Sequence, residues 1–172
     1  MKKILAILLI VSVVAGCNLK KTNFKEAKGK TNFTMQIPDY LTEVTDLNQD
    51  AALQYSNTKE EVYIIVINDS KEELKKSDVT YTLQQYFDFA AKNLQGSVSN
   101  YKLSSPTSKT INGNKALEGE ITGKFQQYDV YYKIAAIESA KNFYQVVTWT
   151  MGDKKDKYAP DMETMIESLK EN

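Results

Sequence analysis

The sequence contains no arginine and no histidine, and it has a single cysteine, Cys17. All 22 basic residues are therefore lysine. The lack of arginine removes the planar guanidinium that best binds carboxylate and phosphate groups. The lack of histidine removes the side chain most used as a general acid, general base or metal ligand. A lone cysteine excludes an intramolecular disulfide. We therefore expect a protein that is not an enzyme, with no catalytic residues, no cofactor and no metal site.

The N-terminus has the layout of a secretory signal, in which Lys2 and Lys3 precede the apolar run Ile4–Val14. A membrane-spanning helix needs roughly 20 apolar residues, and this run is shorter. That argues against two alternatives, an uncleaved membrane helix and a cytosolic protein with an apolar start. The segment that ends at Cys17 resembles a bacterial lipobox. The resemblance implies that the chain is cleaved between Gly16 and Cys17 and that lipid is attached to the Cys17 thiol.

Lipid on Cys17 would anchor the protein to a membrane outside the cytoplasm. Stable anchoring takes two hydrophobic signals or more, and a triacylated cysteine supplies them by itself. Asn18 follows the cysteine where an aspartate would retain a lipoprotein at the inner membrane of a two-membrane bacterium. We therefore expect the outer membrane if the cell has one, and the cell membrane otherwise.

The chain divides into three parts on composition. Residues 1–16 are the signal peptide, residues 17–30 form a lysine-rich, lipidated tether, and residues 31–172 form one globular domain. Contact of the tether with anionic lipid is the alternative to a solvated spacer. Without its signal the chain has 20 basic and 22 acidic residues, so nucleic-acid binding is not expected. We expect a monomer.

The first half of the domain predicts strands followed by a helix. Apolar residues alternate in Phe33–Pro38, and Val62–Ile67 is an unbroken β-branched and aromatic run that suits a strand buried on both faces. Residues 68–78 are predicted to be a loop. Thr82 and Gln85 then fit a capping box that opens a helix with apolar positions up to Leu94.

The second half predicts a run of antiparallel strands and a closing helix. Asn112-Gly113 is a strong signal for a tight hairpin turn. Residues 117–125 alternate, which predicts a strand with one face in the core and the other in water; two more strands follow at 128–136 and 143–151. The apolar positions from Tyr158 to Leu169 have helical spacing, with Pro160 expected in the first turn. The order is that of an α+β fold, an antiparallel sheet flanked by helices on both faces.

This order of elements is similar to the PsbP-like fold, whose members include DcrB-type envelope lipoproteins. The resemblance covers nearly the whole domain and implies a binding or scaffold role without catalysis. Metal-binding positions of photosynthetic members include histidine, and this sequence has none to receive them. The residues that carry the resemblance are Phe33–Pro38, Val62–Ile67, Thr82–Tyr86, Ile111–Gly113 with Ala116, and Ile166–Lys170.

Two motifs have enzymatic or metal-binding alternatives. Ser56–Lys59 and Ser99–Lys102 match the S-x-x-K spacing of penicillin-recognising enzymes, but serine and lysine are common enough here for two chance matches. Asp46–Asp50 matches the first half of a calcium loop, yet Ala51 and Asn57 occupy the positions of its glycine and closing glutamate. We interpret the three segments as structural.

Three classes of function stay open. The first is an envelope lipoprotein that docks on a protein or assembly partner. The second is a small-molecule or peptide binder, for which the 11 tyrosines are the positive feature. The third is a hydrolase that uses carboxylates alone. A flat aromatic face would favour the first class, and a pocket with paired, partly buried carboxylates would favour the third.

The lipobox predicts the behaviour of a variant. Because acylation needs the thiol, Cys17→Ser should leave an unprocessed precursor that incorporates no labelled palmitate, while the parent protein is labelled. Equal labelling of the two proteins would contradict the lipobox interpretation.

Overall fold

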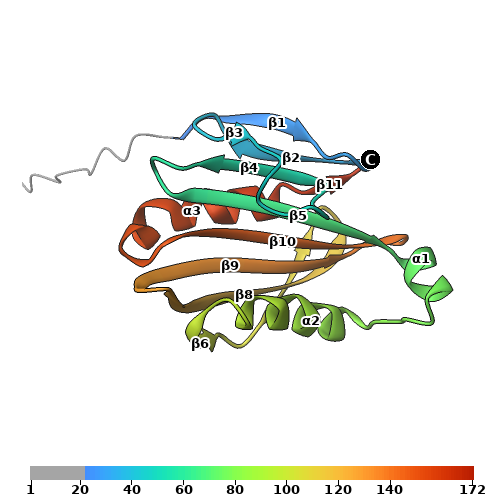
Figure 1. Cartoon of the computed structure of the whole chain (residues 1–172). Coiled ribbons are helices and arrows are strands. Elements are labelled where there is room, and N and C mark those ends of the chain that lie inside the picture. The colour runs from blue at the N-terminus through green and yellow to red at the C-terminus, as the bar shows by residue number, and fades with distance from the viewer. Residues whose placement is uncertain (1–21) are drawn as a thin grey trace, which may run out of the picture.

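The computed structural model describes residues 22–172, and two antiparallel sheets form the centre of this part of the chain (Figure 1). The larger sheet has eight strands in the order β3-β4-β5-β10-β9-β8-β6, and β7 also pairs with β8. The smaller sheet has the order β1-β2-β11. The strands of the larger sheet are β3 (Thr42–Glu43), β4 (Leu53–Asn57), β5 (Val62–Ser70), β6 (Ser99–Leu103), β7 (Thr107–Ile111), β8 (Asn114–Phe125), β9 (Tyr128–Glu138) and β10 (Asn142–Met151), and those of the smaller sheet are β1 (Phe24–Lys28), β2 (Phe33–Pro38) and β11 (Lys170–Glu171).

Helices cover both faces of the larger sheet. One face carries α2, and the other carries α3 together with the smaller sheet (Figure 1). A short helix, α1, follows β5, and the 3-10 helix η1 leads into α3. The helices are α1 (Lys71–Lys76), α2 (Leu83–Gln95), η1 (Gly152–Lys154) and α3 (Lys155–Glu167).

The two hydrophobic cores follow from alternation along the strands. In β5, Val62 and Ile64 belong to the core beneath α3, whereas Ile65 belongs to the core beneath α2. β10 behaves in the same way, with Val146 in the first core and Val147 in the second. The predicted α+β fold is confirmed, with a central strand buried on both faces and helices on opposite sides.

The predicted capping box and the predicted hairpin turn are both present in the structure. The Thr82 side chain accepts a hydrogen bond from the Gln85 backbone, and the Gln85 side chain accepts one from the Thr82 backbone, which completes the capping box. At the β7–β8 hairpin, Asn112 and Gly113 both have positive φ, 47° and 85°. The Asn112 amide also donates to the Leu169 carbonyl at 2.8 Å, so the turn is fixed to the chain that follows α3.

The prediction that residues 17–30 form a tether is wrong for residues 24–30, which belong to the folded domain. Phe24–Lys28 forms β1, which pairs with β2 along its whole length and buries Ala27. Lys30 continues the ordered chain, since its backbone N–H donates to the Ala52 carbonyl at 2.8 Å. A lysine-rich segment resembles a solvated spacer, but lysine is also typical of strands at a sheet edge, where charge discourages further pairing. Gly16, Cys17 and the tether up to residue 21 lie outside the described residues.

Three other expectations need correction. The expected loop at residues 68–78 contains the end of β5 and α1, whose first turn is capped by the Ser70 side chain. The face of β8 expected in water is partly covered by α3, so Glu118 is only 8% exposed. Pro160 lies beyond the first turn of α3, because the helix begins at Lys155 and not near Tyr158.

The placement of β1 predicts the effect of a truncation. A chain that starts at Thr31 loses the partner of β2 and uncovers the apolar surface that Phe24 and Ala27 cover. We expect its free energy of unfolding to fall by roughly 1 kcal/mol or more relative to a chain that starts at Thr22. Urea denaturation of the two proteins measures the difference. Identical midpoints would show that β1 adds nothing to the domain.

Candidate functional site

Three aromatic side chains on adjacent strands stack on the α2 face of the larger sheet. Trp149 of β10 is in register with Tyr63 of β5 on one side and with Tyr132 of β9 on the other. The ring centroids of Trp149 and Tyr63 are 5.1 Å apart with 10° between the planes, and those of Trp149 and Tyr132 are 5.9 Å apart with 25°. Side chains directly opposite each other on one face of a sheet lie close enough to interact. Strand register alone therefore assembles these residues, which we call the aromatic row.

A groove lies over the aromatic row because α2 covers only part of the sheet. α2 packs mainly on β9 and β8 and leaves the neighbouring parts of β5 and β10 less covered. The groove has a volume of about 650 Å³. We call it the aromatic groove; besides the aromatic row, its lining includes Ala90 and Leu94 of α2, Leu47 of the loop before β4, and Phe125 at the end of β8.

The chemistry of the aromatic groove suits binding better than proton transfer. Burial raises the pKa of the Tyr132 hydroxyl, and burial followed by the nearby Glu61 charge raises that of Tyr63. Both phenols are therefore neutral and can donate a hydrogen bond at neutral pH. Among the described residues that line the groove, Asp50 is the one that carries a charge, and Asn93 and Gln145 add amides.

The segment with the half calcium motif forms one wall of the groove. The buried amide of Gln54 organises it: the Gln54 Oε1 atom accepts from the backbone N–H groups of Leu47 and Asn48, at 2.9 and 3.1 Å. The Asn48 side chain in turn accepts from the Asp50 backbone N–H at 2.8 Å. The Gln54 amide thus ties this loop to β4. The loop presents Leu47 to the groove.

The S-x-x-K matches do not bring a lysine to a serine. Ser56 is a buried residue of β4, and Lys59 is exposed in the turn that follows. Ser99 and Lys102 both lie in β6. In these enzymes the motif lies on a helix, where the spacing puts both side chains on one face. Here β6 has a register shift between Ser99 and Lys102, and the Ser99 hydroxyl donates to the Lys124 carbonyl at 3.3 Å. The structural interpretation of both matches agrees with this placement.

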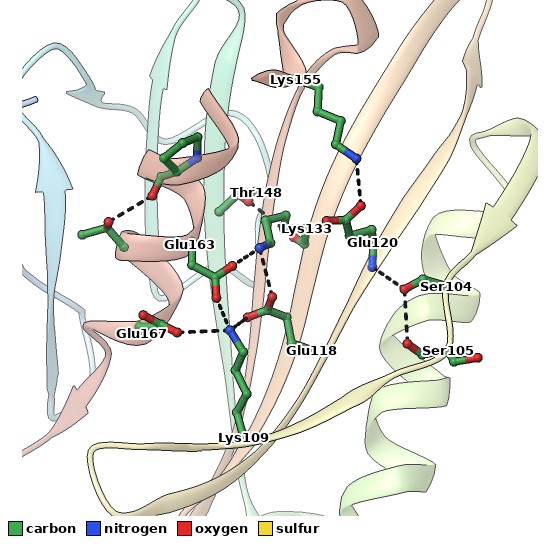
Figure 2. Close-up of polar contacts among 12 residues, drawn as sticks. Ser104, Ser105, Lys109, Glu118, Glu120, Lys133, Thr148, Lys155, Glu163 and Glu167 are labelled. Carbon is green, nitrogen blue, oxygen red and sulfur yellow. Dashed lines mark hydrogen bonds and ion pairs between the residues drawn. The ribbon is translucent and has the colours of Figure 1, made fainter. Parts of the chain in front are cut away.

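A cluster of opposite charges lies between the larger sheet and α3 (Figure 2). Lys133 of β9 and Glu118 of β8 are each 9% exposed at the side chain, and their Nζ and Oε1 atoms are 3.0 Å apart. Glu163 of α3 reaches down between Lys133 and Lys109 and pairs with both. Lys109 also lies 3.2 Å from Glu118 and 3.1 Å from Glu167. We call these five residues the α3 charge cluster.

The α3 charge cluster joins α3 to the larger sheet. Its carboxylates do not form a reactive acid–base pair. Burial lowers the pKa of Lys109, but hydrogen bonds and charge from Glu167 and Glu118 outweigh it, so the pKa is raised. Lys109 therefore remains a cation between three carboxylates. Each carboxylate pairs with a lysine, which makes the cluster a poor source of a free acid or base.

Sequence reasoning found only part of these sites. Tyr132 lies in the predicted strand at residues 128–136, and its side chain is buried in the core beneath α2. Trp149 lies in the predicted strand at residues 143–151, but its stacking on Tyr63 depends on which strands are neighbours, and no local sequence pattern carries that information. The predicted lipidation and cleavage residues, Gly16 and Cys17, lie outside the described residues.

Residues 1–18 match the model of the prokaryotic membrane lipoprotein lipid attachment site. This match makes the chain a membrane-anchored lipoprotein. Within residues 22–172, no helix combines the length and the apolar character that crossing a bilayer requires. No curated protein matches the chain.

Solved structures share the fold at low sequence identity. LpqN of Mycobacterium tuberculosis, described as involved in cell envelope biogenesis, is 10% identical, with a TM-score of 0.61 over 86% of this chain and 89% of its own. The cyanobacterial PsbP of Synechocystis is 12% identical, with a TM-score of 0.60 over 90% and 96%. A Pseudomonas aeruginosa protein of unknown function, called a putative regulator, is 12% identical, with a TM-score of 0.53 over 87% and 97%. The predicted PsbP-like fold is confirmed.

The α3 charge cluster predicts a non-additive pair of variants. Lys133→Met leaves the buried Glu118 carboxylate without its nearest cation, and we expect a loss of about 3–5 kcal/mol in the free energy of unfolding. Adding Glu118→Leu should restore most of that loss, because apolar side chains can replace a buried pair. Urea denaturation of the two single variants and the double variant measures the coupling. Equal and additive losses would contradict the pairing.

Proposed function

We propose that this bacterial lipoprotein with a PsbP-like fold is a non-catalytic binding protein of the cell envelope, held at a membrane by lipid on Cys17. The observation that carries the proposal is the aromatic groove, in which Tyr63, Trp149 and Tyr132 form a stacked floor. The envelope role of the M. tuberculosis structure, which has the same fold, supports the cellular setting.

The groove supports a small-molecule or peptide ligand more than a broad protein interface. Its volume of about 650 Å³ falls within the roughly 300–1,000 Å³ typical of ligand sites. Stacked aromatic rings offer a rigid apolar surface with polar tips. A ligand with a flat or apolar face, such as a ring or an alkyl segment, would therefore lie on the row and take hydrogen bonds from the amides beside it. Docking of a protein partner is the alternative, and it would use the same surface.

A hydrolase that uses carboxylates finds less support. The carboxylates that come together, Glu118, Glu163 and Glu167, are matched by lysines beneath α3. They are on the opposite face of the sheet from the aromatic groove. A substrate in the groove would meet neutral phenols, amides and Asp50.

The chain contains one tryptophan, and because Trp149 is in the groove its fluorescence reports on binding there. We expect the apolar dye N-phenyl-1-naphthylamine to bind saturably to the mature lipoprotein and to accept excitation energy from Trp149. Tyr63→Ser removes one end of the aromatic row and should weaken dye binding about tenfold, which corresponds to about 1.4 kcal/mol.

Tyr55→Ser is the matched control, because Tyr55 is a half-buried tyrosine of β4 that packs with the core on the other face. It should leave dye affinity unchanged. If the dye does not bind, or if the two variants weaken it equally, the groove is not the binding site.

A further inference from the structure

The described chain begins close to the residue that carries the lipid. Thr22 is fixed to the domain, since its hydroxyl donates to the Asp161 carboxylate of α3 at 3.0 Å. Cys17 is five residues earlier. A fully extended chain spans at most about 3.3–3.6 Å per residue, so Thr22 is held within roughly 18 Å of the acylated cysteine. The end of the domain that contains Thr22 is therefore the end that faces the membrane.

The same end carries the turn between β8 and β9. At this end β5 begins beside the end of β10, since Val62 opposes Thr150. β9 also begins here, since Val130 opposes Met151 at the end of β10. α3, which holds Thr22, begins a few residues after β10. Figure 1 shows β1 beginning at the end of the molecule where β8 turns into β9. The opposite end of β9 turns into β10 near Ala140.

Two large aromatic side chains are exposed at this turn. Phe125 is 48% exposed and Tyr128 is 53% exposed, and they flank Gln126 and Gln127. We call residues 125–128 the hairpin tip. It contains no charged side chain, and the nearest charges, Lys124 and Asp129, pair with each other at 2.8 Å. Aromatic side chains with a polar end, such as Tyr128, are typical of the interface between a membrane and water, and Phe125 adds an apolar ring beside it.

We propose that the hairpin tip docks on the membrane surface, with Phe125 and Tyr128 in the lipid interface. The inference rests on the proposed anchoring through Cys17. The lipid anchor keeps the tip near the bilayer, so that even a weak contact is populated. The tip is also stiff, because β8 and β9 pair in register up to Phe125 and Tyr128. Phe125 lines the aromatic groove as well, so docking places one wall of the groove against lipid.

The test uses the full lipoprotein in vesicles of phosphatidylcholine and phosphatidylglycerol. Since acylation occupies the native thiol, Gln127→Cys introduces one reactive thiol at the tip, and Ala140→Cys introduces one at the far end as the control. Each thiol carries an environment-sensitive fluorophore. The two sites are separated by the length of β9, on the order of 35 Å at 3.3 Å per residue. Doxyl-labelled phosphatidylcholine quenches fluorophores that reach the interface.

We expect the label at position 127 to be blue-shifted and quenched several-fold more than the label at position 140. Phe125→Ser combined with Tyr128→Ser should abolish this difference while the protein still sediments with vesicles. Equal quenching at both positions overturns the proposal. Shielding of position 127 in native envelopes but not in vesicles also overturns it, because a protein partner would then cover the tip. Loss of sedimentation would instead show that anchoring through Cys17 fails. Dye binding in the aromatic groove is measured in a separate experiment, so failure of the proposed binding function is distinguished from failure of tip docking.

Discussion

The structure depends on the register of β10 between β5 and β9. Because alternate residues point to opposite faces, this register sends Val146 towards α3 and Val147 towards α2, and a slip of one residue would exchange them. The same pairing brings Trp149 opposite both Tyr63 and Tyr132. The two hydrophobic cores and the aromatic row thus depend on one set of backbone hydrogen bonds, and a change that shifts the register would disrupt both.

The two faces of the larger sheet differ in chemistry. The face beneath α2 is largely apolar, and partial coverage by the helix leaves the aromatic groove. The face beneath α3 also receives the polar side chains Glu118 and Lys133, which alternate with core residues of β8 and β9. Buried charges must be paired, and Lys109 and Glu163 complete the pairing. The charged contact ties α3 to Lys109 and Lys133, at the expense of desolvating the ions.

The sequence predicted those parts of the fold that short segments determine. The Thr82 cap and the Asn112-Gly113 turn depend on neighbours within four residues, and both are as expected. β1 could not be recognised, because its lysines resemble a spacer and its strand character comes from pairing with β2. The burial of Glu118 depends on α3, which follows much later in the chain. The aromatic row also depends on residues far apart in the sequence, since Tyr63 and Trp149 meet only because β5 and β10 are neighbours.

The pairing of β11 with β2 bears on how the domain matures during secretion. A chain that crosses a membrane N-terminus first delivers β1 and β2 together, and these two can form a hairpin at once. The other edge of β2 stays open until Lys170 and Glu171 emerge and pair with Thr34 and Phe33. Glu171 then accepts a hydrogen bond from the buried Tyr144 at 2.8 Å. The nascent chain therefore keeps one edge of β2 unpaired until its last residues have emerged, and an unpaired edge is a site at which chains aggregate.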